Sequence, residues 1–307
     1  MKGRFAPSPS GRMHLGNLFS ALLAWLSVRS QDGTMLLRME DLDPDRCREE
    51  YAAQVARDLE WLGLDWDEGY GAGGPAGPYR QSERSGIYAE AFAGLERKEL
   101  SYPCYCTLAE RLAVSAPHLG ENPGVYDGRC RRRSPEELEQ LAQSRKPAWR
   151  VAVPDVEIAF TDGLQGDCCE NLARECGDFI LRRSDGVWAY QLAVTVDDGL
   201  MGVTEVVRGL DLLFSTPRQI WLLEQMGFAA PAYSHVPLLL SSDGRRLSKR
   251  DQDMDLGMLQ QRKTAPEIIG ELAFLCGLLD RPEAVTPREL VPLFKWEKVC
   301  SQNITVK

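Results

Sequence analysis

The sequence predicts an α/β fold, in which a parallel, Rossmann-type sheet is interrupted by an inserted module and followed by a small helical C-terminal region. Three observations lead to this prediction. A strand, a glycine-containing turn, a helix and a second strand follow one another at the N-terminus. Similar helix and strand patterns return after residue 178, and a stretch rich in cysteine, proline and arginine separates the two halves. With 307 residues, the chain can bury one large core or two modest ones.

The first half of the predicted sheet domain occupies residues 1–100. A turn bounded by Gly11 and Gly16 precedes apolar residues at helical spacing, and a buried strand is expected over residues 34–39. The helices predicted from this spacing cover residues 18–26, 51–62 and 87–95. The loop between the last two is rich in glycine and proline, which favour turns.

The rest of the chain divides into three parts. We expect an inserted module over residues 101–177, the second half of the sheet domain over 178–245, and a helical region over 246–307. In the second half, strands are expected over residues 187–196, 203–207 and 235–240, and a helix over residues 216–226. The C-terminal helix is expected to bury Ile268, Leu272 and Leu275 on one face.

Charge and cysteine content narrow the class of protein. The formal net charge of −9 argues against a general nucleic-acid coat, because phosphate binding depends on Lys and Arg. Any RNA contact must be local, at basic clusters such as residues 129–133, 145–150 or 245–250. The alternative is that these clusters are ordinary solvent-exposed surface. Nine cysteines without a secretory signal indicate reduced thiols. Without an apolar run of membrane-spanning length, we expect a cytoplasmic protein with no membrane partner.

Two motifs indicate a nucleotide site. Residues 4–17 read RFAPSPSGRMHLGN and residues 246–249 read RLSK. Each alone suits a capped helix start or a solvated basic turn, but their joint occurrence around a βα pattern favours nucleotide binding. The pair resembles the two ATP-binding motifs of class I aminoacyl-tRNA synthetases. The resemblance implies a class I synthetase catalytic core that uses ATP and Mg²⁺, with catalytic His14 and Lys249 and with Gly16 and Asn17 also at the ATP. Arg246 departs from the lysine that usually opens the second motif.

Further segments are similar to glutamyl-type synthetases. These are RMEDLDP at residues 38–44, YQLAVTVDD at 190–198 and VRG at 207–209. The resemblance implies a pocket for L-glutamate, whose carboxylates call for guanidinium groups and whose amine calls for an anion. Arg4, Tyr190 and Arg208 would hold the side-chain carboxylate, Glu40 and Ser8 the ammonium, and the backbone through Phe5, Ala6 and Pro7 would line the pocket. Without the resemblance, the charged residues of segment 38–44 read as a surface ion network and Tyr190 as an ordinary strand aromatic.

The inserted module carries a candidate metal site. Cys104, Cys106 and Cys130 lie near Tyr126, and the three cysteines suit either Zn²⁺ or a small cluster of reduced thiols. The pattern resembles the zinc site of glutamyl-queuosine tRNA(Asp) synthetases, which implies one structural zinc per chain with Tyr126 completing the ligand set. His118 is a possible substitute ligand, and no function is assigned to Cys168, Cys169 and Cys176.

Only 58 residues follow Lys249, too few for a large anticodon-binding region. This shortened form is typical of the glutamyl-queuosine tRNA(Asp) synthetases. The resemblance implies activation of L-glutamate to glutamyl-adenylate and its transfer to queuosine in the anticodon loop of tRNA(Asp), by a monomer. Two alternatives remain: a truncated glutamyl-tRNA synthetase that acylates a tRNA 3′ end, and a catalytically silent paralogue that only binds tRNA.

Overall fold

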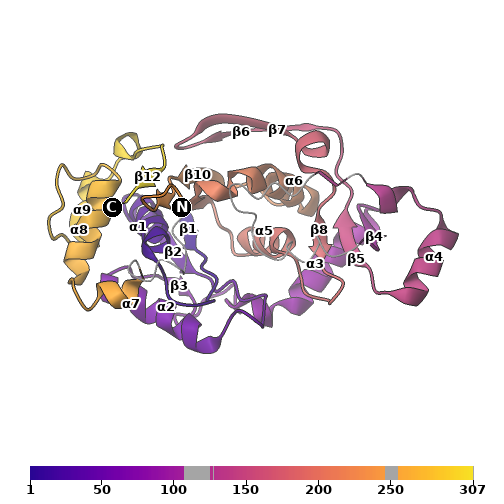
Figure 1. Ribbon diagram of the computed structural model, residues 1–307, viewed down its shortest axis with the longest axis horizontal. Helices are drawn as coiled ribbons and strands as arrows, with labels where there is room; N and C mark the ends of the chain where they lie inside the picture. The colour runs from indigo at the N-terminus through magenta and orange to yellow at the C-terminus, as the bar shows by residue number, and fades with distance from the viewer. Residues whose placement is uncertain (107–124, 127, 246–254, 307) are drawn as a thin grey trace.

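The computed structural model describes residues 1–106, 125–126, 128–245 and 255–306. Helices α8 and α9 lie at one end of the elongated molecule, and α4, β4 and β5 lie at the other (Figure 1). The main sheet lies between these ends. No helix in the described part of the chain is both long and apolar enough to span a bilayer.

The main sheet has seven strands in the order β3-β2-β1-β9-β10-β6-β7. All neighbours pair in parallel except the last two, which form an antiparallel hairpin. The strand bounds are β1 Lys2–Phe5, β2 Thr34–Leu37, β3 Glu68–Gly69, β6 Glu157–Asp162, β7 Gly166–Asn171, β9 Glu205–Gly209 and β10 Ala232–Val236. Such a sheet places the carboxyl ends of its parallel strands at one edge, where open α/β sheets bind ligands.

Different apolar clusters cover the two faces of this sheet. Met35 and Leu37 of β2 belong to the core cluster built around helix α1, whereas Leu36 between them belongs to a cluster on the opposite face. The same alternation separates Val206 from Val207 on β9. Side chains of a strand alternate between faces, so both faces of the sheet are buried, as in a doubly wound α/β domain.

Most predicted helices are present. The structure has α1 Leu15–Arg29, α2 Glu49–Leu62, α3 Ser85–Arg97 and α6 Thr216–Met226. Helix α2 ends at Gly63, whose φ of 78° is the left-handed conformation that glycine adopts readily.

The strand predicted over residues 187–196 is wrong. Helix α5, Tyr190–Leu200, begins there, and every residue from Tyr190 to Asp198 is buried. Its Val and Thr residues are β-branched and favour strands, so a short buried run of this composition does not by itself separate a helix from a strand. The strand predicted over 235–240 is also divided, because β10 ends before Pro237 and β11 covers only Leu239–Leu240.

The range 101–177, predicted as an inserted module, contributes to two sheets. Strands β4 Ser101–Cys104 and β5 Ala148–Val151 form a separate antiparallel sheet with β8 Ile180–Arg182. Helix α4, Pro135–Ser144, lies beside this sheet. The β6–β7 hairpin, by contrast, extends the main sheet next to β10 (Figure 1). The domain boundaries given above stay predictions.

The C-terminal region packs onto the sheet domain. Its elements are α7 Leu256–Leu259, α8 Ala265–Leu275, α9 Pro287–Leu290 and β12 Ile304–Thr305, which pairs with β11. Ile268 and Leu272 of α8 are fully buried, and Leu275 packs against the same core cluster as α1. The predicted apolar face of this helix is therefore present, and it is covered by the core of the sheet domain.

Candidate active site

The turn after β1 ends in a tightly capped helix. His14 is the N-cap of α1: its Nδ1 accepts a hydrogen bond of 3.2 Å from the Gly16 amide, and Asn17 Oδ1 accepts one of 3.1 Å from the His14 amide. A Cβ on Gly16 would lie 3.1 Å from the His14 ring, so a larger residue there would crowd the imidazole. Because Nδ1 accepts, the ring carries its proton on Nε2, and the neutral imidazole presents a donor away from the helix start.

Lys249 lies outside the described residues, as do Arg246 and the rest of the RLSK motif. The chain after that gap returns to the His14 turn. Asp255 forms a β-bridge with His14, and the Leu256 amide donates a hydrogen bond of 3.0 Å to the Met13 carbonyl oxygen. The described chain thus resumes at Asp255 beside the first motif, six residues beyond Lys249.

Four residues predicted for the glutamate pocket gather at the carboxyl edge of the sheet. Arg4 lies in β1, Glu40 follows β2, Arg208 lies in β9 and Tyr190 begins α5. All four are largely or fully buried, and Tyr190 is within electrostatic range of the other three. Burial raises the pKa of Glu40 against the lowering effect of nearby arginines.

Arg4 has few partners for a buried guanidinium. Its side chain is 5% exposed, yet its one hydrogen bond is 3.3 Å, from Nη1 to the Val207 carbonyl oxygen. Its Nε lies 3.6 Å from Asp198 Oδ1 and hydrogen bonds to no atom of the described residues. Burial lowers the pKa of Arg4, and neighbouring Arg38 acts in the same direction. A buried guanidinium with unused donors is suited to an anionic ligand.

Arg208 is held much more firmly. Its Nε donates to His235 Nε2 at 2.9 Å, its Nη1 to Gln219 Oε1 at 2.7 Å, and its Nη2 to Thr216 Oγ1 at 2.7 Å. Nη2 also lies 3.4 Å from the Leu212 carbonyl oxygen. A guanidinium has five N–H groups, so these contacts leave one N–H on Nη1 for a ligand.

The first segment of the pocket is joined to the segment that carries Glu40. The Arg38 amide donates to the Phe5 carbonyl oxygen at 3.0 Å, and the Glu40 amide donates to the Pro7 carbonyl oxygen at 2.9 Å. Ala6 lies between these two contacts, and Ser8, which follows them, is exposed. The backbone predicted to line the pocket therefore runs directly beside Glu40, and Ser8 stands at its open side.

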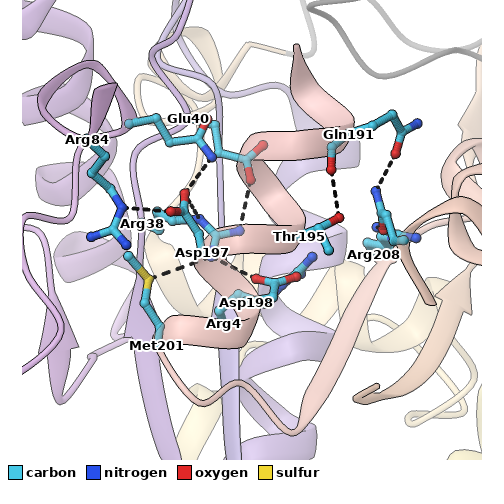
Figure 2. A network of polar contacts seen from close by, with 12 residues as sticks. Arg4, Arg38, Glu40, Arg84, Gln191, Thr195, Asp197, Asp198, Met201 and Arg208 are labelled. Atoms are coloured by element: carbon cyan, nitrogen blue, oxygen red, sulfur yellow. Dashed lines mark hydrogen bonds and ion pairs between the residues drawn. The ribbon is translucent and has the colours of Figure 1, made fainter. Parts of the chain in front are cut away.

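Glu40 is held by a buried network of ion pairs that was not predicted from the sequence (Figure 2). Arg38 is fully buried and donates to Asp198 at 2.7 Å and to Glu40 at 3.1 Å, while its Nε lies 3.6 Å from Asp197. Arg84 donates to Asp197 at 2.7 Å. The alternative reading of segment 38–44 as a surface ion network therefore fails for Arg38. The paired charges were visible in the sequence as the Arg of the RMEDLDP segment and the two Asp residues of the YQLAVTVDD segment, which lie together in the fold.

The predicted metal ligands converge in the small antiparallel sheet. The sulfur atoms of Cys104, Cys106 and Cys130 all lie within 4.8 Å of one another. Tyr126 Oη is 3.4 Å from two of these sulfurs and accepts a hydrogen bond of 3.1 Å from the Cys130 amide. An ion with Zn–S bonds of ~2.3 Å holds its sulfurs roughly 3.8 Å apart in a tetrahedron. The donor set therefore fits Zn²⁺. His118 lies outside the described residues.

One arginine lies against this cluster. Arg150 Nε donates to Cys104 Sγ at 3.3 Å, and its guanidinium carbon lies 3.8 Å from the centroid of the Tyr126 ring. Burial acts to raise the pKa of the Cys130 thiol, but hydrogen bonding with Tyr126 lowers it to about 7. Positive charge beside the sulfurs favours thiolates, the form that binds metal ions.

The comparisons with known proteins agree with this geometry. Residues 1–305 match the protein family described as "tRNA synthetases class I (E and Q), catalytic domain". The glutamyl-Q tRNA(Asp) synthetase of Symbiobacterium thermophilum is 50% identical over 310 residues, which cover 99% of this chain and 95% of that protein. The protein of the same name from Nitratidesulfovibrio vulgaris is 49% identical over 296 residues, 95% of this chain and 91% of that protein.

A solved structure adds a contrast in length. The crystal structure of a glutamate tRNA ligase from Elizabethkingia meningosepticum, in complex with its amino acid, has a TM-score of 0.84 at 28% identity. It covers 100% of this chain, but this chain covers only 67% of that one. The chain therefore belongs to the class I aminoacyl-tRNA synthetases of the glutamyl and glutaminyl type, and it is a ligase whose relatives of matching length are glutamyl-Q tRNA(Asp) synthetases.

Proposed function

We propose that this ligase activates L-glutamate with ATP and transfers the glutamyl group to queuosine in the anticodon loop of tRNA(Asp). One observation carries the proposal: Arg4, Glu40, Tyr190 and Arg208 converge at the carboxyl ends of β1, β2 and β9, in a chain that matches glutamyl-Q tRNA(Asp) synthetases over almost their whole length. The pocket offers two cations and one anion, the complement of a dicarboxylic amino acid.

Glutamate recognition follows from the unused hydrogen-bonding groups. The side-chain carboxylate would take the unused Nε donor of Arg4, the remaining Nη1 hydrogen of Arg208 and the O–H of Tyr190, whose oxygen already interacts with Gln219. The ammonium group would bind Glu40, with Ser8 at the open side of the pocket. Charge-assisted hydrogen bonds at fixed guanidinium groups discriminate against glutamine, whose amide places a donor where the pocket also has donors.

The activation step uses the nucleotide motif. An oxygen of the glutamate α-carboxylate bonds to the α-phosphorus of ATP, the bond from that phosphorus to the bridging oxygen breaks, and pyrophosphate leaves. The His14 Nε2–H would donate to a phosphate oxygen as negative charge develops, and Gly16 and Asn17, whose amides both donate to His14, would hold this ring at the start of α1 beside the ATP. Lys249 would hold the opposite end of the triphosphate. Mg²⁺ supplies charge neutralisation between the phosphates when it is bound.

Transfer needs no further catalytic group from the protein. A hydroxyl oxygen of the queuosine cyclopentenediol bonds to the carbonyl carbon of glutamyl-adenylate, the bond from that carbon to the phosphate oxygen breaks, and AMP leaves with the hydroxyl proton taken up by its phosphate. The tRNA would approach from the side of the predicted inserted module, residues 101–177. There, Arg129, Arg131 and Arg132 of the short helix Arg129–Arg132 are exposed next to Cys130 and suited to phosphate contacts.

The Cys104, Cys106, Cys130 and Tyr126 cluster would hold one structural Zn²⁺. The ion would lie beside the small sheet, in the predicted inserted module, and it would tie β4 to the helix Arg129–Arg132 that carries the exposed arginines. The proposed chemistry does not pass through this ion.

The decisive experiment incubates the enzyme with labelled glutamate, ATP and total tRNA, followed by nuclease digestion and identification of the labelled nucleotide. Label on queuosine, absent when the tRNA comes from queuosine-deficient cells, is the expected result. Label on a 3′-terminal adenosine would instead identify a truncated glutamyl-tRNA synthetase. Absence of glutamate-dependent ATP–pyrophosphate exchange would identify a paralogue that only binds tRNA.

A further inference from the structure

A buried chain of hydrogen bonds extends from Arg208 to a strand of the predicted insertion. Arg208 Nε donates to His235 Nε2 at 2.9 Å, and His235 Nδ1 lies 2.6 Å from Asp162 Oδ2. His235 belongs to β10, and Asp162 is the last residue of β6. The exposed fractions of the three side chains are 4%, 0% and 2%.

The direction of these hydrogen bonds is fixed. An arginine Nε–H only donates, so His235 Nε2 must accept and the imidazole proton must lie on Nδ1, facing Asp162. Burial, with a contribution from Arg208, lowers the pKa of His235 to about 4 against the raising effect of Asp162, so the ring is neutral near pH 7. A charged imidazole would direct an N–H at the Arg208 Nε–H, which this geometry excludes.

Asp162 is held as an acceptor by the backbone. Its carboxylate accepts hydrogen bonds from the amides of Leu164, Gln165 and His235 at 3.0, 2.9 and 3.1 Å. Its pKa is lowered because the hydrogen bonds with His235 and these amides outweigh the effect of burial. The tight turn between β6 and β7 therefore fixes an anion that selects one tautomer of His235.

We propose that Asp162 and His235 are positioning residues that set the orientation of the Arg208 guanidinium, and through it the affinity of the pocket for the side-chain carboxylate of glutamate. The inference rests on the role proposed above for Arg208. His235 fixes the Nε edge of the guanidinium and Thr216 fixes Nη2, which directs Nη1, the atom with the remaining N–H, into the pocket. The β6–β7 hairpin thus contributes to amino-acid recognition without touching the substrate.

Replacing Asp162 by Asn keeps the shape but changes the donor pattern. If the Asn amide nitrogen faces His235 Nδ1, the imidazole proton moves to Nε2 and opposes the Arg208 Nε–H. If the amide oxygen faces His235, the amide nitrogen is directed at the backbone N–H groups that donate hydrogen bonds to the Asp162 carboxylate in the unchanged protein. In the first orientation Arg208 loses the acceptor for its Nε–H. In the second, the side chain of residue 162 loses the amide contacts that hold it in place, so His235, and through it Arg208, is less firmly oriented.

The test measures glutamate-dependent ATP–pyrophosphate exchange in the full-length protein, with enzyme concentration corrected by active-site titration. D162N is expected to raise the KM for glutamate roughly 10- to 100-fold, while the KM for ATP and kcat change by less than about threefold. H235L should act in the same way, whereas H235Q, whose amide oxygen can accept from Arg208, should recover most of the affinity. D167N makes the same chemical change at an exposed position of the same hairpin and serves as the matched control.

Unchanged KM for glutamate in D162N, or equal KM values in H235L and H235Q, would overturn the inference. A purely structural role would lower the titrated active fraction and leave the KM for glutamate of the folded enzyme as it was. If D162N does not fold, the comparison of H235L with H235Q decides alone. Absence of glutamate-dependent exchange in the unchanged enzyme would overturn the proposed function itself, which is a different result from any of these.

The tautomer offers a readout that does not depend on activity. The chain contains three histidines, so the ¹⁵N resonances of His235 can be assigned by comparison with H235Q. The expected spectrum shows a neutral ring protonated on Nδ1 in the unchanged protein and in D167N. Protonation on Nε2 in the unchanged protein would contradict the inferred direction of the hydrogen bonds.

Discussion

Asp198 accepts a hydrogen bond of 2.7 Å from Arg38, and both side chains are buried. The same carboxylate oxygen lies 3.6 Å from Arg4, a residue of the proposed glutamate pocket. Arg38 in turn donates to Glu40. One buried pair therefore connects the cation proposed for the substrate side chain with the anion proposed for its ammonium group.

Removing the charge of Asp198 should destabilise the protein and weaken glutamate binding. D198N is expected to lower the free energy of unfolding by about 3–5 kcal/mol, because it leaves buried Arg38 and Arg4 short of an anion. Urea unfolding measures this loss. D185N, which removes an exposed carboxylate, should stay within about 0.5 kcal/mol of the unchanged protein. A loss below about 1 kcal/mol in D198N would show that the network is not needed to compensate the arginines.

The two arginines of the pocket should respond differently to truncation. R4A is expected to raise the KM for glutamate roughly 100-fold or more while preserving stability better, since within the described residues the Arg4 side chain makes one long hydrogen bond and one ion pair of 3.6 Å with Asp198. R208A should also abolish glutamate-dependent pyrophosphate exchange, but with a marked loss of stability, because His235, Gln219 and Thr216 lose their donor. Exchange assays and thermal unfolding together separate the effects. Unchanged glutamate kinetics in R4A would remove Arg4 from the pocket.

Purified protein should contain about one zinc ion per chain. C130S is expected to lose it, and R150M to release it faster to a chelator, because Arg150 contacts the Cys104 sulfur and the Tyr126 ring. Elemental analysis and a colorimetric chelator assay measure both effects. C169S removes an exposed thiol on β7 and should keep the metal. Protein that is metal-free after purification under zinc-replete conditions would contradict the assignment.

Stability should depend on pH through His235. Burial lowers its pKa from 6.5 to about 4 in the folded protein. Between these values the unfolded chain binds more protons than the folded chain, so the free energy of unfolding rises with pH. The contribution is complete above pH 6.5 and is lost as the pH falls towards 4, with a total on the order of 3 kcal/mol.

Urea unfolding from pH 4.5 to 7.5 measures this dependence, and H235Q provides the comparison. Because Gln does not titrate, the slope for H235Q should be smaller by the His235 contribution. Carboxylates away from His235 contribute equally to both proteins, and Asp162, whose pKa is lowered from 3.8 in part by His235, titrates below this pH range. Parallel curves for the two proteins would show that His235 does not titrate differently in the folded and unfolded states.

The helices that were predicted correctly carry local signals. α1 follows a glycine-containing turn, and α6 ends at Gly227, whose φ is 79°. α5 carries no such signal, since its N-cap Ala189 makes no capping hydrogen bond and its β-branched run imitates a buried strand. The pocket residues followed from the family resemblance of short segments. The buried contacts that hold these residues could not be predicted from the sequence, because Arg38 and Asp198 are 160 positions apart and Asp162 and His235 are 73 apart.

The pairing of β6 with β10 has a consequence for how this enzyme can be rebuilt. Residues 101–177 resemble a separable insertion in the sequence. They nevertheless supply two strands, β6 and β7, to the main sheet, and Asp162 of β6 interacts with His235 beside the proposed pocket. Chimaeras that exchange residues 101–177 between relatives therefore transplant part of the main sheet together with the surface proposed to contact RNA. Grafts that leave residues 157–171 with the host sheet should be the ones that retain amino-acid selectivity.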